Sequence, residues 1–362
     1  MFHLPTQIFF GSDALAEAAD YIFNLGSKPL LVSGPVGARK SGALGDVEKL
    51  LQSFAIPWAH FDEVEENPSL DTVMAGAQLL RAEQCDYVIA IGGGSPLDAA
   101  KAIALVAANA LQRAQIYQTE LFQCKLPLIA IPTTSGTGSE VTQYSVLTNP
   151  DTGIKSGFGH VLAFPSLAIC NPIYTHSLNS QVTLNTALDA LSHLLEGIYS
   201  NKRQALADPL IHAGARDIFE NLQPVLENPS LASGREKLMR ASLYGGITIA
   251  QGSTTLQHSL GYPLTSRFGT PHGLSNALVM LPVLKLFYSA RKVELNALFA
   301  ALNTSLEGFA LWLESLNLPS CPPLEDDFIA KSVQEVLGSR NMANNPQEVS
   351  APQIRQIYLD LR

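Results

Sequence analysis

Asp189 and His193 are the first residues whose types and spacing suggest chemistry. They lie four positions apart in a segment that is otherwise rich in Leu and Ala, and this spacing places both side chains on one face of a helix. A carboxylate and an imidazole in such surroundings must pair with each other, bind a metal or contact water. Taken alone, the pair is best interpreted as an Asp–His hydrogen bond in a partly buried helix.

Two further histidines favour a metal site. His258 and His272 both lie within residues 241–284, where Arg267 is the only Asp, Glu, Lys or Arg. Buried imidazoles with no nearby acid need a partner, and a metal shared with the first pair would supply one. Three imidazole nitrogens and one carboxylate suit Fe²⁺ or Zn²⁺, and ligand chemistry does not choose between these ions.

A glycine-rich segment has the pattern of a phosphate-binding loop. The apolar run Tyr87–Ile91 leads directly into the sequence GGGSPLD at 92–98. Ser95 is a suitable helix N-cap, and Asp98 stands where the acid of a capping box would. Such a loop presents free N–H groups and the positive end of a helix dipole to a phosphate. A plain strand-to-helix turn would explain this pattern equally well.

A second loop strengthens the nucleotide interpretation. The apolar run Leu126–Ile131 is followed by a segment dense in hydroxyls and glycine, which includes Thr133, Thr134 and Thr137. In a parallel sheet, loops at the carboxyl ends of neighbouring strands form the cleft for a dinucleotide. The two loops together therefore predict NAD or NADP as cofactor.

The end of the run Pro29–Ser33 bears on the choice between these two nucleotides. An acid at this position would bind the ribose hydroxyls and repel a 2′-phosphate, but the residue here is Gly34. Arg39 and Lys40 follow within a few positions. We therefore expect NADP to be slightly favoured over NAD.

The elements that must position these residues change in kind near residue 180. Before it, β-rich runs alternate with helical patterns, which is typical of a parallel sheet covered on both faces. After it, the patterns are helical only, with connectors rich in Pro. The expected helices there are Leu184–Tyr199, Pro209–Leu226, Arg235–Gln251, Leu274–Ser289, Leu306–Leu316, Phe328–Leu337 and Ala351–Leu361. We predict an α/β dinucleotide-binding domain with a parallel sheet over residues 1–180 and an all-α metal and substrate domain over 181–362. The expected strands are Gln7–Phe10, Pro29–Ser33, Trp58–Phe61, Tyr87–Ile91 and Leu126–Ile131.

Composition excludes several other classes of protein. The chain has 362 residues, of which 46% are hydrophobic and 15% charged, and its formal net charge is −9. Disordered and coiled-coil proteins carry far more charge, and a nucleic-acid partner would require a basic face that is absent here. The charge-free stretches 156–188 and 241–266 are too polar and too broken to cross a membrane.

The cysteines and the start of the chain suggest a cellular location. The four cysteines are widely spaced without a C-x-x-C pair, so we expect reduced, buried thiols rather than disulfides or a zinc knuckle. The first Lys or Arg is Lys28, which leaves no charged region for a signal peptide. These features predict a cytoplasmic protein.

At this point the motifs resemble those of the iron-containing (group III) alcohol dehydrogenases over essentially the whole chain. The resemblance rests on the segments 92–101 and 132–137, on the Asp189–His193 pair, and on His258 with His272 fourteen residues later. The joint occurrence is much more specific than any one motif. It implies a nucleotide domain, a helical domain, a cleft between them that holds NAD(P) and the metal, and a homodimer for which Gln7–Phe10 is a candidate edge strand.

The resemblance also implies roles for individual residues. The metal ligands would be Asp189, His193, His258 and His272. The nucleotide contacts would include Asn67, Gly93, Gly94, Ser95, Thr133, Thr134 and Lys155, to which the loops discussed above add Gly34, Asp98 and Thr137. Many members carry a further histidine four residues after the third ligand, whereas Tyr262 stands there in this chain. Tyr262 can donate a hydrogen bond, but a proton relay through imidazole is in doubt at that place.

The activity that follows is metal-assisted hydride transfer between a nicotinamide and a small alcohol or aldehyde, with Fe²⁺ expected and Zn²⁺ possible. Alternatives on the same scaffold are a hydroxyacid–oxoacid transhydrogenase and a lyase similar to dehydroquinate synthase. The lyase should have several Lys and Arg near the metal, where only Arg267 is found. A non-catalytic nucleotide-binding protein is disfavoured by the complete ligand set. The few charges suggest a neutral substrate, although Arg267 keeps an anionic one open.

Overall fold

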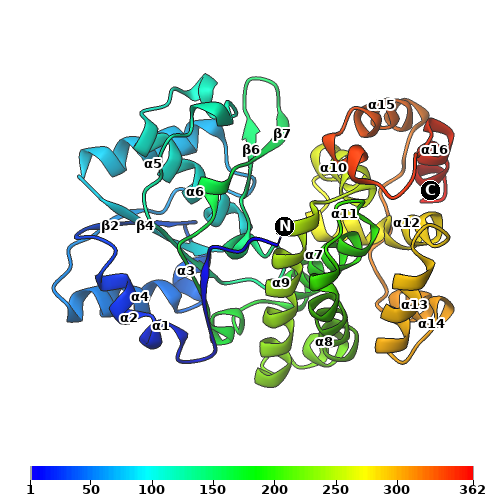
Figure 1. The fold of residues 1–362 in the computed structure, drawn as a ribbon, viewed down its shortest axis with the longest axis horizontal. Helices are drawn as coiled ribbons and strands as arrows, with labels where there is room; N and C mark the ends of the chain where they lie inside the picture. Colours follow the sequence, from blue (N-terminus) through cyan, green and yellow to red (C-terminus); the bar gives the residue numbers. More distant parts are fainter. Residues whose placement is uncertain (1, 362) are drawn as a thin grey trace. The chain divides into compact units, whose positions relative to one another are not determined.

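The computed structural model describes residues 2–361 (Figure 1). Its internal contacts divide the chain into two compact units. The sheet unit comprises Leu4–Asn179 and Pro229–Met239, and the helical unit comprises Met1–His3, Ser180–Asn228 and Arg240–Arg362. Each unit is described separately below.

The sheet unit is built on a six-stranded sheet in the order β1-β8-β5-β4-β2-β3, with every neighbouring pair parallel. Four of its central strands are buried runs of apolar residues, as expected for a parallel sheet covered on both faces. The predicted parallel α/β domain is confirmed. The strands are β1 (Gln7–Phe10), β2 (Pro29–Ser33), β3 (Ala59–Phe61), β4 (Tyr87–Gly92), β5 (Leu128–Pro132) and β8 (Leu167–Cys170).

Alternate residues of these strands enter two separate cores. Leu30 and Val88 belong to the core on the face covered by α5 (Leu70–Ala82) and α6 (Gly94–Asn109). Leu31 and Ile89 point the other way, toward α1 (Ala14–Glu17), α2 (Ala19–Phe23) and α4 (Ala43–Ser53). This period of two follows from the pleat, because successive side chains point to opposite faces. A short helix, α3 (Gly37–Lys40), follows β2.

The sequence did not predict three strands of this unit. Tyr144–Asn149 (β6) and Ile154–Gly159 (β7) pair as an antiparallel hairpin, and β8 lies between β1 and β5 in the sheet. All three lie within residues 144–170, where Gly and Pro interrupt the apolar pattern that predicts a strand. β1 lies at the edge of the sheet, as expected.

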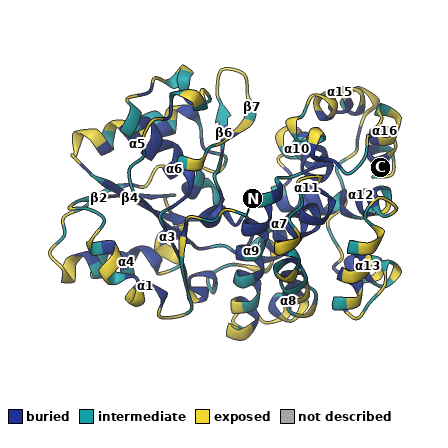
Figure 2. Ribbon diagram, in the orientation of Figure 1, coloured by how far each residue is buried: buried dark blue, intermediate teal, exposed yellow. Residues whose placement is uncertain are grey.

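The helical unit contains only helices among its described residues. Its first helix, α7, is buried along most of its length because the rest of the unit packs around it (Figure 2). Two helices were not predicted: α10, which contains Gly261 and Pro263 in its interior, and α13. The helices are α7 (Ser180–Tyr199), α8 (Asp208–Glu227), α9 (Ala232–Gly252, whose part up to Met239 belongs to the sheet unit), α10 (Leu256–Phe268), α11 (His272–Leu278), α12 (Met280–Phe287), α13 (Lys292–Ala301), α14 (Leu306–Ser315), α15 (Asp326–Leu337) and α16 (Ala351–Leu359).

Among the described residues, no helix combines the length and apolar character that a membrane span requires. The prediction of four buried thiols is correct for Cys85 and Cys170 but wrong for the other two cysteines. Cys124 is exposed and Cys321 is half-buried, because both lie in irregular segments rather than in strands or at their edges.

Candidate functional site

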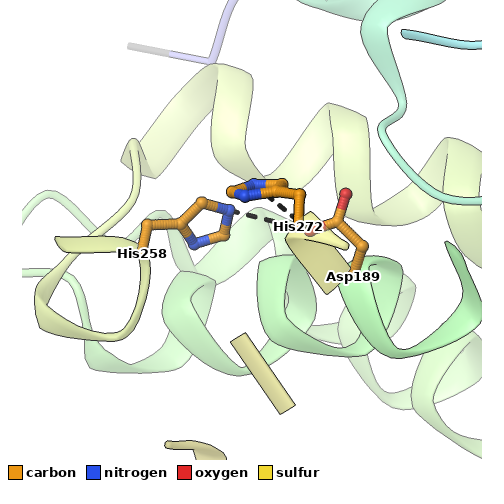
Figure 3. Close-up of side chains that lie close together, drawn as sticks. All are labelled: Asp189, His258 and His272. Carbon is orange, nitrogen blue, oxygen red and sulfur yellow. Dashed lines mark ion pairs between the residues drawn. The ribbon is translucent and has the colours of Figure 1, made fainter. Parts of the chain in front are cut away.

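The helical unit brings the predicted metal ligands together. Asp189 and His193 lie one turn apart on α7, His258 lies in the first turn of α10, and His272 is the first residue of α11. In Figure 3 the side chains of Asp189, His258 and His272 point toward one another. Asp189 Oδ1 lies 3.6 Å from His272 Nε2 and 3.9 Å from His258 Nε2. One ligand atom from each of these three residues lies within 4.8 Å of the other two.

His193 completes the group of four. Its Nε2 lies 3.2 Å from Nε2 of His258 and 3.9 Å from Oδ1 of Asp189. The two imidazole rings are stacked, with centroids 4.9 Å apart. Asp189, His193 and His258 are each at most 4% exposed, whereas about a quarter of the His272 side chain is accessible. The group is therefore buried on all sides except that of His272.

Two glycines let helices approach α7 closely enough to form this group. A Cβ atom at Gly273 would lie 1.8 Å from the backbone oxygen of Asn185 on α7. A Cβ at Gly245 on α9 would lie 3.1 Å from the backbone oxygen of Ala190 and 3.2 Å from Cβ of His193. A Cβ cannot be accommodated at position 273 without moving a backbone, whereas at position 245 it would require a shift of a few tenths of an ångström.

The amide nitrogen of Asn276 lies among the ligand atoms. Its Nδ2 lies 3.1 Å from Asp189 Oδ1, 3.2 Å from His258 Nε2 and 3.3 Å from His272 Nε2. An amide nitrogen carries two hydrogens, so it cannot donate to all three of these atoms, and each imidazole Nε2 accepts from it only in the tautomer that carries its hydrogen on Nδ1. A divalent cation would satisfy every ligand atom at once, and the donor set of imidazole nitrogens and one carboxylate is the set that such ions prefer. The residues present fit a metal.

Electrostatics agree with this interpretation. Burial by itself raises the pKa of the Asp189 carboxyl, but His193, His272, His258 and the Asn276 amide outweigh it and leave that pKa below its usual value. The carboxyl group is therefore an anion in the interior at neutral pH. A buried anion surrounded by imidazoles favours a cation at the same place.

Glu196 is a residue of this region that the sequence analysis missed. It is fully buried on α7, three positions after His193. Its Oε1 accepts hydrogen bonds from the backbone N–H and the hydroxyl of Thr255, both at 2.8 Å, and its Oε2 accepts one from Nδ1 of His258. Glu196 follows Asp189 by seven positions and His193 by three, a spacing that places all three side chains on one helix face and could have marked Glu196 as part of the site.

Tyr262 lies beside the ligand group. Its ring stacks on that of His272, with centroids 5.6 Å apart and an interplanar angle of 11°, and meets the His258 ring edge to face at 6.2 Å. Tyr262 is half-buried. Arg267 lies in the last turn of the same helix and is exposed.

The sheet unit holds the predicted nucleotide loops, but the start of α6 differs from the prediction. The N-cap is Gly93 and the helix begins at Gly94, so the prediction that Ser95 caps it with Asp98 in a capping box is wrong. Ser95 Oγ instead accepts a hydrogen bond from the backbone N–H of Asn67 at 3.2 Å. Asp98 accepts bonds from Ser139 Oγ at 2.5 Å and from the backbone N–H of Val146 at 3.0 Å. Tertiary partners thus replace the local caps that the sequence suggested.

The two predicted loops lie side by side. A Cβ atom at Gly93 would lie 3.2 Å from Cγ2 of Thr134, and one at Gly94 would lie 2.7 Å from Cγ2 of Thr137. The backbone N–H of Thr133 donates to the carbonyl of Gly92 at 2.8 Å, which continues the pairing of β4 with β5. Gly93 and Gly94 thus leave out the side chains for which this helix N-terminus has no space, and their exposed N–H groups suit a phosphate.

Asn67, Ser95 and Lys155 form one connected group beside these loops. Lys155 Nζ donates to Asn67 Oδ1 at 2.7 Å, and Thr148 of the hairpin donates to the carbonyl of Asn67 at 3.0 Å. Asn67 has a φ of 57°, which asparagine tolerates better than most residues. Gly34 lies close by, because a Cβ there would be 3.0 Å from the backbone oxygen of Val64 and 4.0 Å from Pro96. The structure therefore places every predicted nucleotide contact near the carboxyl ends of β2, β4 and β5.

A buried lysine ties the hydroxyl-rich loop to α6. Lys101 is 1% exposed, and its Nζ donates to Ser139 Oγ at 2.6 Å, Thr142 Oγ1 at 3.2 Å and the carbonyl of Tyr144 at 2.7 Å. Burial lowers the pKa of Lys101, and burial raises the pKa of its neighbour Glu140 to about 7. This network could not be predicted from the sequence, because its members are distant along the chain.

Comparison with known proteins assigns the chain to a family. Residues 5–172 match the family model described as iron-containing alcohol dehydrogenase, and residues 183–312 match the C-terminal model of the same family. Alcohol dehydrogenase 4 of Saccharomyces cerevisiae is 33% identical over 284 residues, which cover 78% of this chain and 74% of the yeast protein. The NADPH-dependent butanol dehydrogenase of Clostridium saccharobutylicum is 31% identical and covers 83% of this chain and 76% of its own. The crystal structure of an iron-containing alcohol dehydrogenase from Thermotoga maritima is 36% identical, with a TM-score of 0.93 over 100% of this chain and 99% of that one.

The fold and these matches define a nicotinamide-dependent oxidoreductase of a family that uses a metal. The chain belongs to the iron-containing alcohol dehydrogenase family, which confirms the resemblance seen in the sequence. It is an enzyme of NAD(P)-linked oxidation and reduction of alcohols and aldehydes.

Proposed function

We propose that this enzyme reduces a small neutral aldehyde, or oxidises the corresponding alcohol, at a metal held by Asp189, His193, His258 and His272. The observation that carries the proposal is the convergence of these four side chains within the helical unit. A divalent ion at this place supplies a Lewis acid that stabilises negative charge on the substrate oxygen.

The chain's own residues would orient the reactants and control the proton. The loops at Gly93, Gly94, Thr134 and Thr137 leave the α6 N-terminus open for the diphosphate of the nucleotide. The half-buried ring of Tyr262 lies against His272, where its hydroxyl can donate a hydrogen bond near the substrate. We propose that this tyrosine helps to position the substrate and to pass the alcohol proton to water.

We also propose a division of labour between residues 1–180, which bind the nucleotide, and residues 181–362, which hold the metal and the substrate. The positions of the two groups of residues support it, since the predicted nucleotide contacts all lie in the sheet unit and the ligands all lie in the helical unit. Fe²⁺ is the expected ion, and Zn²⁺ has compatible chemistry.

A direct spectrophotometric assay tests the main proposal. Absorbance at 340 nm would be followed with NADPH or NADH and a series of short aldehydes, after anaerobic loading with Fe²⁺ and again after chelation. We expect nucleotide oxidation that disappears with the metal and is absent from a His272→Ala variant. Full activity and full metal content in that variant would overturn the ligand assignment.

NADP is the nucleotide that the end of β2 favours. Gly34 offers no carboxylate to a ribose, and Ser33 Oγ lies 2.9 Å from Nε2 of His60 on the neighbouring strand. The side chain of Arg39 is exposed, and its Nη2 lies 3.8 Å from Oε1 of Glu48, which makes the ion pair a weak one. We expect a higher kcat/KM for NADPH than for NADH.

Two variants of Gly34 separate charge from size. A Cβ here would lie 3.0 Å from the backbone oxygen of Val64, so Gly34→Ala measures the steric cost alone. Gly34→Asp adds a carboxylate, and relative to Gly34→Ala it should lower kcat/KM for NADPH at least about tenfold while affecting NADH less. A strong preference of the unaltered enzyme for NADH would refute the NADP proposal.

A homodimer in the cytoplasm completes the proposal. β1 is an edge strand, with Gln7 exposed and Ile8, Phe9 and Phe10 half-buried, so a second copy could extend the sheet there. The four cysteines are free thiols, as in a reducing compartment. Light scattering of the purified protein tests the dimer, and Ile8→Lys, which charges the edge, should shift it toward the monomer.

A further inference from the structure

Glu196 occupies a special place next to the proposed metal centre. Its carboxylate is fully buried, and both of its oxygens accept hydrogen bonds from residues at the start of α10. Oε1 accepts from the backbone N–H and hydroxyl of Thr255 and, at 3.2 Å, from the backbone N–H of His258. The N-cap residue Thr255 makes no capping bond with its own side chain. A carboxylate from another helix therefore caps α10.

The second oxygen of this carboxylate contacts a proposed metal ligand. Oε2 accepts a hydrogen bond from Nδ1 of His258. A neutral imidazole carries its hydrogen on one nitrogen only, so a hydrogen held on Nδ1 leaves Nε2 unprotonated. Nε2 is the atom that faces His193 at 3.2 Å and Asp189 at 3.9 Å. The geometry therefore presents the lone pair of His258 to the place where the ligand atoms converge.

We propose that Glu196 is the positioning residue of the metal centre: it fixes the orientation and tautomer of His258 so that Nε2 is available to the metal. The inference rests on the proposed function, since it requires a metal at Asp189, His193, His258 and His272. Carboxylates that hold the second nitrogen of a ligating histidine typically change metal affinity by about 10- to 100-fold when they are altered.

Glu196→Gln is the informative substitution because it keeps the size and removes the charge. Three donors converge on Oε1, so the amide that replaces the carboxylate should keep its oxygen there and turn its NH₂ toward His258. Nδ1 would then have to accept, and the imidazole hydrogen would move to Nε2, where it opposes metal binding. Thr255→Val is the matched control, because it removes one contact of the same carboxylate and leaves the contact with His258 in place.

Metal affinity is the readout. The purified proteins would be stripped of metal and titrated with Zn²⁺ against a chelating dye, with Asp189→Ala as the background for binding elsewhere. We expect Glu196→Gln to bind Zn²⁺ at least about tenfold more weakly than the unaltered protein and Thr255→Val to remain within about threefold. Equal affinity of Glu196→Gln and the unaltered protein would overturn the inference, and so would an equal loss in both variants, which would indicate a structural role of the cap.

A second measurement uses the unaltered protein and does not depend on how a variant folds. Nitrogen-15 spectra of the histidine side chains in the metal-free protein report the tautomer of each imidazole, with His258→Gln used to assign the signal. We expect His258 to carry its hydrogen on Nδ1, and a hydrogen on Nε2 would overturn the inference. If the unaltered protein itself binds no Zn²⁺ above the Asp189→Ala background, the proposed metal centre fails, and the inference fails with it for a distinguishable reason.

Discussion

Replacing Gly273 by alanine should separate α11 from α7 and disrupt the proposed metal centre. The added Cβ would lie 1.8 Å from the backbone oxygen of Asn185 and 3.0 Å from Cβ of Asp189. Ordinary contacts between such atoms need about 3.5 Å, and a backbone oxygen inside a helix cannot turn aside. The start of α11 must therefore retreat by more than about 1 Å, and His272, the preceding residue, moves with it. Metal–ligand distances tolerate about 0.2 Å, so His272 ceases to be a ligand.

The loss of a ligand should lower metal affinity more than the change of a residue that only supports a ligand, so we predict at least about a 100-fold decrease in Zn²⁺ affinity. The steric overlap should also lower the stability of the helical unit by about 3 kcal/mol. Gly252→Ala on α9 is the control in the same unit, because its Cβ would lie 3.6 Å from Ser200, an ordinary contact. Zn²⁺ titration and urea unfolding of both variants measure the two effects. Metal affinity in Gly273→Ala equal to that of the unaltered protein would refute the packing argument.

Three further predictions concern the sheet unit. Gly94→Ala should weaken NADPH binding, measured by fluorescence titration, by about tenfold or more, because its Cβ would lie 2.7 Å from Cγ2 of Thr137. Adding Thr137→Ser removes that methyl group and should restore most of the affinity. If the double variant binds as weakly as Gly94→Ala, this overlap is not the cause of the loss. Lys101→Met should lower the urea midpoint of the sheet unit, at a cost of about 3 kcal/mol, since it breaks a buried network, and Zn²⁺ affinity should stay unchanged; an unaltered midpoint would contradict this. The pKa of Glu140 is raised from 4.5 to about 7 in the folded protein, so the folded state binds more protons and the free energy of unfolding falls as pH rises between these values. Glu140→Gln should remove up to about 3 kcal/mol of this decline between pH 5 and pH 8. Identical pH profiles of urea unfolding in the two proteins would show that Glu140 does not titrate there.

The sequence predicted what depends on local pattern. β1 and β2 begin and end where their apolar runs predict, and α6 follows the glycine loop as expected. The i, i+4 spacing of Asp189 and His193 correctly placed both on one helix face, because a helical period needs only nearby residues.

What the sequence could not predict depends on contacts between distant residues. α10 forms in spite of Gly261 and Pro263, whose low helix propensity is overcome by packing against α11 and α15. Asp98 has the spacing of a capping acid, yet Ser139 and Val146 bind it from more than 40 residues away. Local propensity is a weak guide wherever such tertiary partners are available.

A metal bound at the proposed site would also act as a reversible cross-link. Asp189 and His272 are more than 80 residues apart in the chain, so a bound metal would hold together segments that are not held together in the unfolded chain. Unlike a disulfide, this cross-link has a strength set by the free ion concentration, and each tenfold increase above the Kd adds about 1.4 kcal/mol to the folded state. The thermal midpoint of the helical unit should therefore rise and fall with metal supply. Chains made under metal starvation should unfold and be degraded sooner than chains that hold the metal.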